Sequence, residues 1–218
     1  MMSLEAELVA AREVDVDAIA ASIESVGFEC TRCGECCTAD DEQAHTATVF
    51  PDEIRTLQVA TDREWSAVAR PLPYGLDADG QGETFEWALQ VDDCGDCVFY
   101  EEADGRGACT VHSERPLICQ TYPFSLDIGD GVDAPGAVVE QVGALQVHEC
   151  EGVGGKITHA DARALAETLK RRTIVELREA IAVRDGYESV DDVGTVVHDS
   201  EGAKRADGTP IAGHGDNY

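Results

Sequence analysis

The chain has 218 residues, of which 43% are hydrophobic, and this composition is typical of a globular protein with a buried core. Asp and Glu total 44 against 16 Lys and Arg, so the formal net charge is −28, which argues against a nucleic-acid partner because that charge repels phosphates. No run of about 18 apolar residues and no basic leader followed by an apolar stretch occurs, so we expect no membrane span, no secretory signal and a cytoplasmic protein.

The acidic residues are spread along the whole chain and are not gathered in one tail. Such a distribution is typical of a solvated surface adapted to high salt, where screening relieves the repulsion between like charges. We therefore expect a halophilic, acidic protein, and the charge by itself indicates no activity.

Residues 1–27 are predicted to be helical. Apolar residues recur at helical spacing, first at Leu4 and Leu8 and then, after a start signal at Asp15, at Ile19 and Ile23. Gly27 is typical of a helix end, so the cysteine-rich stretch "FECTRCGECC" (28–37) follows directly on a helix.

The next part of the chain alternates short strands with helices. Residues 46–59 predict a short strand and then a helix with Pro51 in its first turn. Another helix is predicted to begin at Thr61 as N-cap, with Glu64 completing a capping box, and to end before Pro71. After a Gly- and Asp-rich loop at 74–83, residues 84–91 alternate and predict one strand that carries Phe85 and Trp87 on a single face.

The stretch "CGDCVFYEEADGRGACTVH" (94–112) predicts a hairpin around Asp104-Gly105, which would place Cys97 and Cys109 on neighbouring strands. Residues 113–124 predict one helical turn, capped by Ser113, ahead of Tyr122-Pro123. Residues 136–142 and 144–150 are further strand candidates.

Residues 158–183 form the clearest predicted helix, started by Thr158 and Asp161. Its apolar stripe indicates core packing and comprises Leu165, Leu169, Ile174, Leu177 and Ile181. We expect a fold of the α+β class, a small, metal-stapled, cysteine-rich single domain with flanking helices and short antiparallel strands. The expected segments are a helical segment (1–27), a cysteine-cluster domain (28–155), a C-terminal helix (156–184) and an acidic, loosely ordered tail (185–218).

Nine cysteines dominate the chemistry of the sequence. Disulfides favour secreted chains with even cysteine counts and small cores, whereas this count is odd and the length needs no staples. Closely spaced C-x2-C pairs are good metal chelates, because both sulfurs can converge on one ion. The pattern therefore indicates a metal-binding protein.

The spacing alone does not choose between iron–sulfur and zinc. Cys30, Cys33 and Cys36 follow C-x2-C-x2-C, which is similar to part of a ferredoxin-type run, although no closing C-P follows Cys37. The pair Cys30/Cys33 with the pair Cys94/Cys97 fits a four-cysteine zinc site. Thiolates suit both metals.

The adjacent pair Cys36 and Cys37 suggests two metal sites. Neighbouring side chains of an extended segment point to opposite sides, so both thiols would have difficulty reaching one tetrahedral ion. Eight cysteines would then make two four-thiolate sites, and a ninth would be spare.

The cysteine pattern resembles the CxxCxxCC cysteine-cluster family of zinc- or iron-chelating domains, the YkgJ-like proteins. The shared positions run from residue 28 to about 155 and comprise Phe28, Cys30, Cys33, Gly34, Cys36, Cys37, Cys97, Cys109, Val111, Arg115, Pro116, Cys119, Tyr122, Pro123, Phe124 and Cys150. The resemblance implies a metal-binding cytosolic domain, often an iron–sulfur protein, and the flagellin lysine methylases carry a related pattern.

The chain departs from the family pattern at Gln120, where a basic residue is usual, and at His112, where tyrosine is common. Cys94 is extra to the family's usual eight cysteines and is the candidate spare. The candidate metal ligands are therefore Cys30, Cys33, Cys36, Cys37, Cys97, Cys109, Cys119 and Cys150, with Cys94 as the ninth.

Four other side chains are candidates beside the cysteines. Arg32 and Arg115 are cofactor-binding candidates, because a guanidinium can donate to a thiolate and offset its charge. The alternative for each is a surface arginine that pairs with one of the many acids. His112 and His148 each lie within three residues of a cysteine and could replace a ligand.

Three functions remain open at the level of the sequence. The first is an iron–sulfur protein, with a [4Fe–4S] cluster, that carries electrons to a redox partner protein or supports a redox reaction, and the C-x2-C-x2-C run and the family resemblance favour it over zinc. The second is a zinc-binding structural or interaction domain without catalysis, and the third is a cluster-containing enzyme such as a methyl-transfer or redox catalyst. Because the ligands join distant segments, the fold is expected to depend on the metal.

Overall fold

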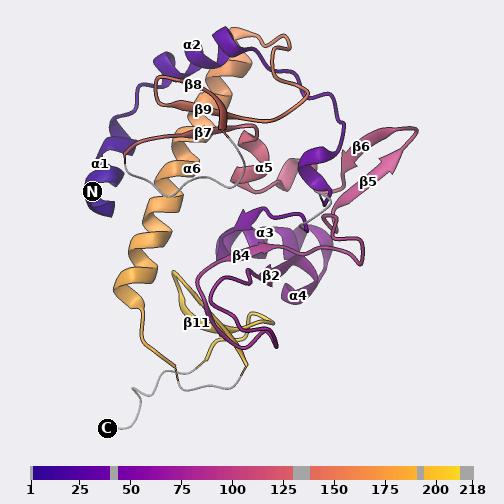
Figure 1. The fold of residues 1–218 in the computed structure, drawn as a ribbon, viewed down its shortest axis with the longest axis vertical. Helices are drawn as coiled ribbons and strands as arrows, with labels where there is room; N and C mark the ends of the chain where they lie inside the picture. Colours follow the sequence, from indigo (N-terminus) through magenta and orange to yellow (C-terminus); the bar gives the residue numbers. More distant parts are fainter. Residues whose placement is uncertain (1, 40–43, 130–137, 191–193, 212–218) are drawn as a thin grey trace. The chain divides into compact units, whose positions relative to one another are not determined.

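The computed structural model describes residues 2–39, 44–129, 138–190 and 194–211. Helices and short, mostly antiparallel strands are both present, which confirms the predicted α+β class (Figure 1). Contacts divide the chain into two compact units, each built from three separate stretches. The first unit holds residues 1–37, 100–109 and 117–178, and the second holds residues 38–99, 110–116 and 179–218.

The first unit contains a three-stranded antiparallel sheet, a two-stranded hairpin and several helices. The sheet has the strand order β7-β9-β8, and the hairpin pairs β5 with β6. The elements are α1 (Leu4–Glu13), α2 (Val16–Val26), the 3₁₀ turn η1 (Glu35–Cys37), β5 (Tyr100–Ala103), β6 (Arg106–Cys109), α5 (Leu117–Thr121), β7 (Phe124–Leu126), β8 (Val138–Val142), β9 (Leu145–His148) and most of α6 (His159–Gly186).

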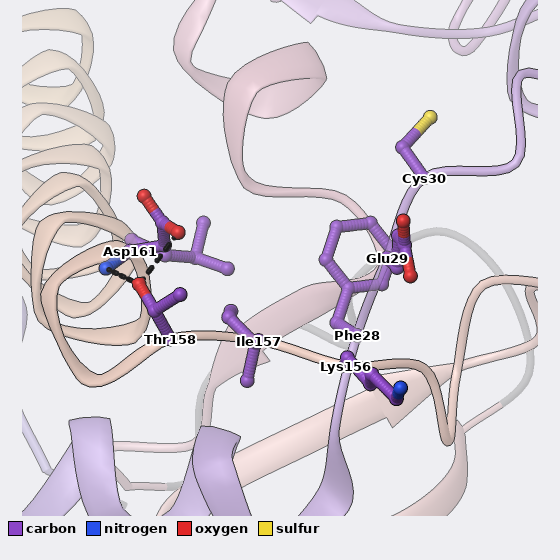
Figure 2. A pocket seen from close by; sticks show the side chains of 8 residues that line it. Phe28, Glu29, Cys30, Lys156, Ile157, Thr158 and Asp161 are labelled. Atoms are coloured by element: carbon purple, nitrogen blue, oxygen red, sulfur yellow. Dashed lines mark hydrogen bonds between the residues drawn. The ribbon is translucent and has the colours of Figure 1, made fainter.

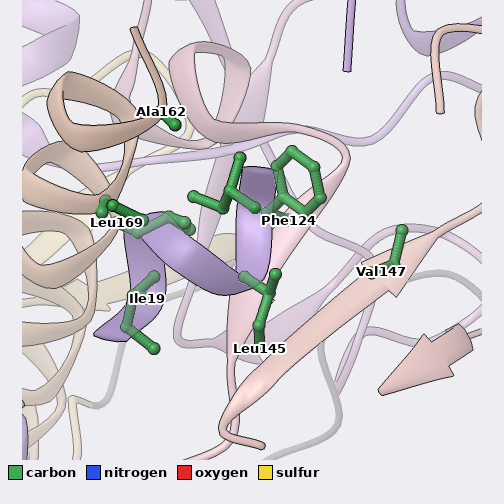
Figure 3. Close-up of a cluster of buried hydrophobic side chains, with 9 residues drawn as sticks. Ile19, Phe124, Leu145, Val147, Ala162 and Leu169 are labelled. Carbon is green, nitrogen blue, oxygen red and sulfur yellow. The ribbon is translucent and has the colours of Figure 1, made fainter. Parts of the chain in front are cut away.

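The core of the first unit lies between α2, the strands β7 and β9, and α6. Figure 3 shows Ile19 of α2, Leu145 and Val147 of β9, and Leu169 of α6 gathered in this core. Their exposures are 5% or less, so each removes nearly all of its apolar surface from water. Phe124 of β7 packs edge-on against Phe28, with the ring centroids 5.6 Å apart. The core therefore reaches the residue that opens the cysteine-rich stretch.

The predicted helices before residue 28 are confirmed. Asp15 caps α2, because its Oδ1 accepts hydrogen bonds from the backbone N–H groups of Asp17 and Ala18. Gly27 ends the helix with φ +77°, a backbone conformation that favours glycine. The sequence thus predicted how the chain enters the cysteine-rich stretch.

The long helix α6 is also confirmed, although its buried face differs from the predicted stripe. The Thr158 hydroxyl and the Asp161 carboxylate form its capping interaction at 2.6 Å. The buried residues are Ala162, Ala166, Leu169 and Arg172, whereas Leu165 is only half-buried. Small alanines allow α6 to pack closely in the core. The predicted apolar stripe did not include these alanines.

The second unit contains two three-stranded sheets. One has the order β1-β4-β2 and is antiparallel, and in the other β10 pairs antiparallel with β11 and parallel with β3. Its elements are β1 (Thr48–Val49), α3 (Pro51–Thr61), α4 (Trp65–Val68), β2 (Ala69–Pro71), β3 (Gly82–Thr84), β4 (Trp87–Leu89), the 3₁₀ turn η2 (His112–Glu114), β10 (Thr195–Asp199) and β11 (Gly202–Arg205). The predicted strand and Pro51-initiated helix are confirmed.

The prediction of a helix capped by Thr61 is wrong. Thr61 is the last residue of α3, and its hydroxyl donates to the Leu57 carbonyl at 2.7 Å. Asp62 follows in the left-handed conformation and ends α3, so the short helix α4 begins only at Trp65. The single strand predicted for 84–91 is likewise interrupted: β4 covers Trp87–Leu89, and Phe85 remains 48% exposed.

The expectation of a loosely ordered tail after Arg184 is wrong for residues 194–211. These residues form β10 and β11, and Val197 of β10 is fully buried. Asp199 accepts hydrogen bonds from Trp87 Nε1 at 2.9 Å and from Lys204 Nζ at 2.7 Å, all three being buried. A polar sequence therefore folds here because its charges pair inside the unit. Residues 191–193 and 212–218 lie outside the described residues.

The predicted hairpin around Asp104-Gly105 is confirmed as β5 and β6. Cys109 pairs with Tyr100 across it, but Cys97 does not belong to β5 and instead forms an isolated bridge with Val91. Ser113 lies inside η2 and is not a cap, and the predicted helical turn is α5, which begins after Pro116.

Candidate metal centre

Close backbone packing in the first unit places Cys30 and Cys150 at the ends of two joined segments. Phe28 bridges Val153, and the backbone N–H of Glu29 donates to the Gly152 carbonyl at 3.0 Å. A Cβ atom on Gly152 would lie 2.5 Å from the Glu29 oxygen, and one on Gly155 would lie 2.7 Å from the Glu29 nitrogen. The glycines after Cys150 are therefore needed for this approach.

The loop from Cys30 to Cys37 is attached to the β5–β6 hairpin. The backbone N–H of Gly107 donates to the Arg32 carbonyl at 2.8 Å. A Cβ atom on Gly34 would lie 2.7 Å from Cζ of Tyr100, so a glycine lets the tyrosine ring cover the loop. Arg32 and Gly34 have φ of +60° and +91°, and this tight path leads into η1.

The prediction that Cys36 and Cys37 lie in an extended segment is wrong, because both residues lie in the 3₁₀ turn η1. The Cys37 N–H donates to the Gly34 carbonyl at 2.7 Å, and the two Sγ atoms lie 3.8 Å apart. Side chains that follow each other in a 3₁₀ turn are not on opposite sides of the chain. The adjacency of these cysteines therefore gives no geometric reason for two sites.

Cys150 lies among the three cysteines of the C-x2-C-x2-C run. Burial raises the pKa of its thiol, a hydrogen bond from the Gly152 N–H at 3.4 Å lowers it, and the charges of Cys33, Cys36 and Cys30 raise it further. The three thiols of the run are thus close enough to act on the Cys150 thiol, although more than a hundred positions separate them from it in the sequence.

Tyr122 lies beside the same thiols. Burial, followed by the charges of Cys150 and Cys36 and of the carboxylates of Glu149 and Glu35, raises the pKa of Tyr122 to about 12. Its hydroxyl donates to the Glu149 carbonyl oxygen. Tyr122 is therefore a half-buried tyrosine near these thiols that stays neutral at physiological pH.

The remaining cysteine candidates differ in burial and in the unit to which they belong. Cys37, Cys109 and Cys119 are half-buried in the first unit. Cys94 and Cys97 belong to the second unit. Cys94 is exposed in a turn in which its backbone N–H donates to Asp92, whereas Cys97 is buried, with 6% of its surface exposed. The structure thus groups seven of the nine candidates in one unit.

The non-cysteine candidates have less direct connections to the thiols. The Arg32 side chain is exposed and makes no hydrogen bond or ion pair with the described residues, while Arg115 Nε donates to the His112 carbonyl at 3.2 Å within the second unit. His148 is buried, and its Nε2 lies 2.8 Å from the Ser125 hydroxyl, so that nitrogen already has a partner. His112 is exposed on η2.

Sequence reasoning missed a solvent-open cavity of about 490 Å³ that borders Cys30. Its wall combines the half-buried apolar residues Phe28, Ile157 and Leu165 with the charged residues Glu29, Lys156 and Asp161. Figure 2 shows that the labelled side chains come from the segment around Cys30, from the residues that lead into α6 and from its first turn. No sequence motif marks it, because its two sides are more than a hundred residues apart.

The donor set fits a thiophilic metal. Thiols suit zinc or an iron–sulfur cluster as ligands and disfavour magnesium or calcium. Among the described ranges, no three His, Cys, Asp or Glu side chains form a group that could hold a metal ion. No helix of the described residues is long and apolar enough to cross a membrane.

Comparison with known proteins identifies the family of this arrangement. Neither the curated proteins nor the solved structures contain a match. The profile of the CxxCxxCC family, whose description reads "Putative zinc- or iron-chelating domain", matches residues 29–151, which is more than half of the chain. The matched range begins beside Cys30 and ends just after Cys150, so it spans the four neighbouring thiols. The chain belongs to the CxxCxxCC family.

Proposed function

We propose that the first unit binds an iron–sulfur cluster of the [4Fe–4S] type through Cys30, Cys33, Cys36 and Cys150. The observation that carries this proposal is the backbone contact between the segments of Cys30 and Cys150, where the Glu29 N–H donates to the Gly152 carbonyl at 3.0 Å. A C-x2-C-x2-C run with a fourth cysteine from a distant part of the chain is the ligand pattern of ferredoxin-type clusters.

A second set of ligands remains after these four are assigned. Cys37, Cys109 and Cys119 lie in the first unit, and all three are half-buried. Cys97 is the eighth ligand predicted from the sequence, and that assignment rests on the sequence alone. We propose that Cys37, Cys109 and Cys119 bind metal independently of Cys150.

The surroundings of the four thiols favour electron transfer. An iron–sulfur cluster supplies a one-electron redox centre when it is bound. Cys30, Cys33 and Cys36 are exposed, which leaves a path for electron exchange with a redox partner protein, while Cys150 and Tyr122 are half-buried. Solvent exposure and hydrogen bonds to sulfur, such as the one from Gly152, set the reduction potential.

Spectroscopy of the anaerobically purified protein tests this function. If the cluster is present, we expect a brown protein whose visible absorption is bleached by dithionite. The reduced protein should give an electron paramagnetic resonance signal. The Cys150→Ser variant should lose that signal in large part. A colourless protein that contains zinc and shows no reducible absorption would overturn the iron–sulfur assignment.

A zinc-binding structural role is the second candidate, and the geometry of η1 favours it. Two thiolates on one tetrahedral zinc, each at about 2.3 Å from the ion, are about 3.8 Å apart. The Cys36 and Cys37 sulfurs are 3.8 Å apart. If both bind one zinc ion, Cys36→Ser and Cys37→Ser should each lose the same ion, whereas the iron–sulfur proposal expects losses from different sites.

A cluster-containing enzyme is the third candidate, and the open cavity beside Cys30 is the observation that favours it. A reaction at a metal–thiolate centre needs a place where a small substrate can lie next to it. Electron paramagnetic resonance of the reduced protein, recorded while small molecules are added, tests this idea. The Ile157→Trp variant fills the cavity. A ligand that shifts the spectrum of the wild type but not of this variant would support an enzymatic role. A spectrum that no small molecule changes would contradict that role.

A further inference from the structure

Arg172 is a buried arginine on the face of α6 that packs in the first unit, with 8% of its surface exposed. Its Nη1 donates to the Thr121 hydroxyl at 3.0 Å and to the Phe124 carbonyl at 3.4 Å. Its Nε donates to Glu176 at 2.6 Å, one helical turn further on, which orients the guanidinium and balances its charge. A buried arginine with three acceptors is a specific structural element and not a surface charge.

The hydrogen bond to Thr121 fixes the helix that carries Cys119. Thr121 is fully buried and ends α5, and its hydroxyl donates to the Leu117 carbonyl at 2.8 Å while it accepts from Arg172. A hydroxyl can do both, because it has one donor and two acceptor positions. Cys119 lies between the two residues that this relay connects, so the orientation of α5 depends on Arg172.

The hydrogen bond to Phe124 fixes the other end of the segment 121–124. Phe124 begins β7 and packs against Phe28, two residues before Cys30. Between the two contacts of Arg172 lies Tyr122, whose hydroxyl donates to the Glu149 carbonyl and whose ring lies near Cys150. One guanidinium thus holds both ends of the segment 121–124, which contains Tyr122 and follows closely on Cys119.

We propose that Arg172 is a positioning residue for metal binding, which holds Cys119 and Tyr122 in the arrangement that the metal requires. This inference rests on the proposed metal-binding function. Arginine suits this role because its planar fork reaches both acceptors at once, whereas a lysine ammonium is a point charge on a flexible stem. Arg172→Lys is therefore expected to be a poor replacement.

The rate of metal release to a chelator tests the proposal. Arg172→Met and Arg172→Lys should release the metal about 10-fold faster than the wild type, the size typical of residues that orient a ligand. Arg171→Met is the matched control, because Arg171 is the exposed neighbour on the same helix. In a Cys119→Ser background the effect of Arg172→Met should disappear. Equal rates in wild type and Arg172→Met, or an undiminished effect without Cys119, would overturn the proposal.

Two further measurements separate this inference from the metal-binding proposal itself. Alkylation of the metal-free chain by iodoacetamide, mapped by mass spectrometry, should become several-fold faster at Cys119 in Arg172→Met and unchanged at the exposed Cys94. If Arg172→Met does not fold, Thr121→Val removes the same acceptor with little change of shape and should give the same increase. Wild-type protein without metal would refute metal binding alone, whereas an unchanged alkylation rate at Cys119 would refute the role of Arg172.

Discussion

Several groups of the first unit act on the Cys150 sulfur. Cys150 is half-buried and its sulfur accepts a hydrogen bond from the Gly152 N–H. The charges of three other thiols raise the pKa of its thiol. A metal that binds these thiols removes their protons, and the mutual repulsion becomes attraction to the ion. If these thiols bind metal as proposed, the loss of Cys150 should therefore lower the metal content.

We predict that Cys150→Ser loses one complete metal site, because the other three thiols lose the ligand that closes the group. Cys94→Ser is the matched control and should keep its metal, since Cys94 is exposed in a turn and is extra to the family's eight. Metal analysis of both purified variants measures this difference. Equal losses in the two variants would show that Cys94 is a ligand as well.

Glu201 gives a pH dependence to the second unit. Hydrogen bonds from Arg55 at 2.5 Å and Lys204 at 2.7 Å lower the pKa of Glu201 to about 2. A carboxyl group with a lowered pKa stabilises the fold above its ordinary pKa, and this contribution is lost as the pH falls toward the folded value.

The free energy of unfolding should therefore decrease between about pH 4.5 and pH 2 in the wild type, and less so in Glu201→Gln. Denaturant titrations at a series of pH values measure both slopes. Glu188→Gln, which changes an exposed glutamate near the end of α6, is the control and should keep the wild-type slope. Parallel curves for wild type and Glu201→Gln would contradict the assignment.

At the scale of elements, the glycines after Cys150 determine how closely the two cysteine-bearing segments approach. Gly155→Ala would place a Cβ atom 2.7 Å from the Glu29 nitrogen, so one backbone has to move. We expect a loss of about 1–3 kcal/mol in the free energy of unfolding and a lower metal content, both measured on the purified variant. Gly186→Ala, where the added Cβ meets open space, should change neither. Full metal content in Gly155→Ala would argue against the close approach.

The core of the first unit contains no cysteine, which limits how far the fold depends on metal. The elements α2, β9 and α6 share their own buried apolar cluster. Removal of metal by a chelator should therefore increase hydrogen exchange strongly in residues 29–37 and only weakly in α6. Mass spectrometry of exchanged peptides measures both regions. Complete loss of protection in α6 would instead support the stronger expectation from the sequence, that the whole fold depends on the metal.

The elements that the sequence predicted correctly are those with local signals. Asp15 and Gly27 mark the ends of α2, and Asp104-Gly105 marks the turn of the hairpin. The predictions failed where distant groups decide the outcome. Val197 and Lys204 fold into an ordered sheet because Trp87 and Asp199 complete their surroundings, and a Gly- and Asp-rich sequence does not reveal such partners.

The same distinction holds for the candidate site. The cysteine spacing predicted a metal-binding family member, and the family match confirms it. The association of Cys150 with Cys30, the cavity next to it and the contacts of Arg172 all join residues far apart in the chain, so no local pattern could indicate them. The adjacency of Cys36 and Cys37 misled the prediction because the backbone is a 3₁₀ turn and not a strand.

At the scale of the whole molecule, the net charge of −28 should make stability depend on salt. Like charges repel one another in the folded chain, and added salt screens them. The midpoint of thermal unfolding should rise by several degrees between low and molar KCl at pH 7. The rise should be much smaller near pH 4.3, where the calculated net charge is close to zero. Identical salt effects at both pH values would contradict a role for the surface charge.

Chemical analysis of the anaerobically purified protein is the sharpest test of whether Cys30, Cys33, Cys36 and Cys150 bind an iron–sulfur cluster. We predict iron and labile sulfide in equal amounts, at least about four of each per chain. Stoichiometric zinc without labile sulfide would contradict it.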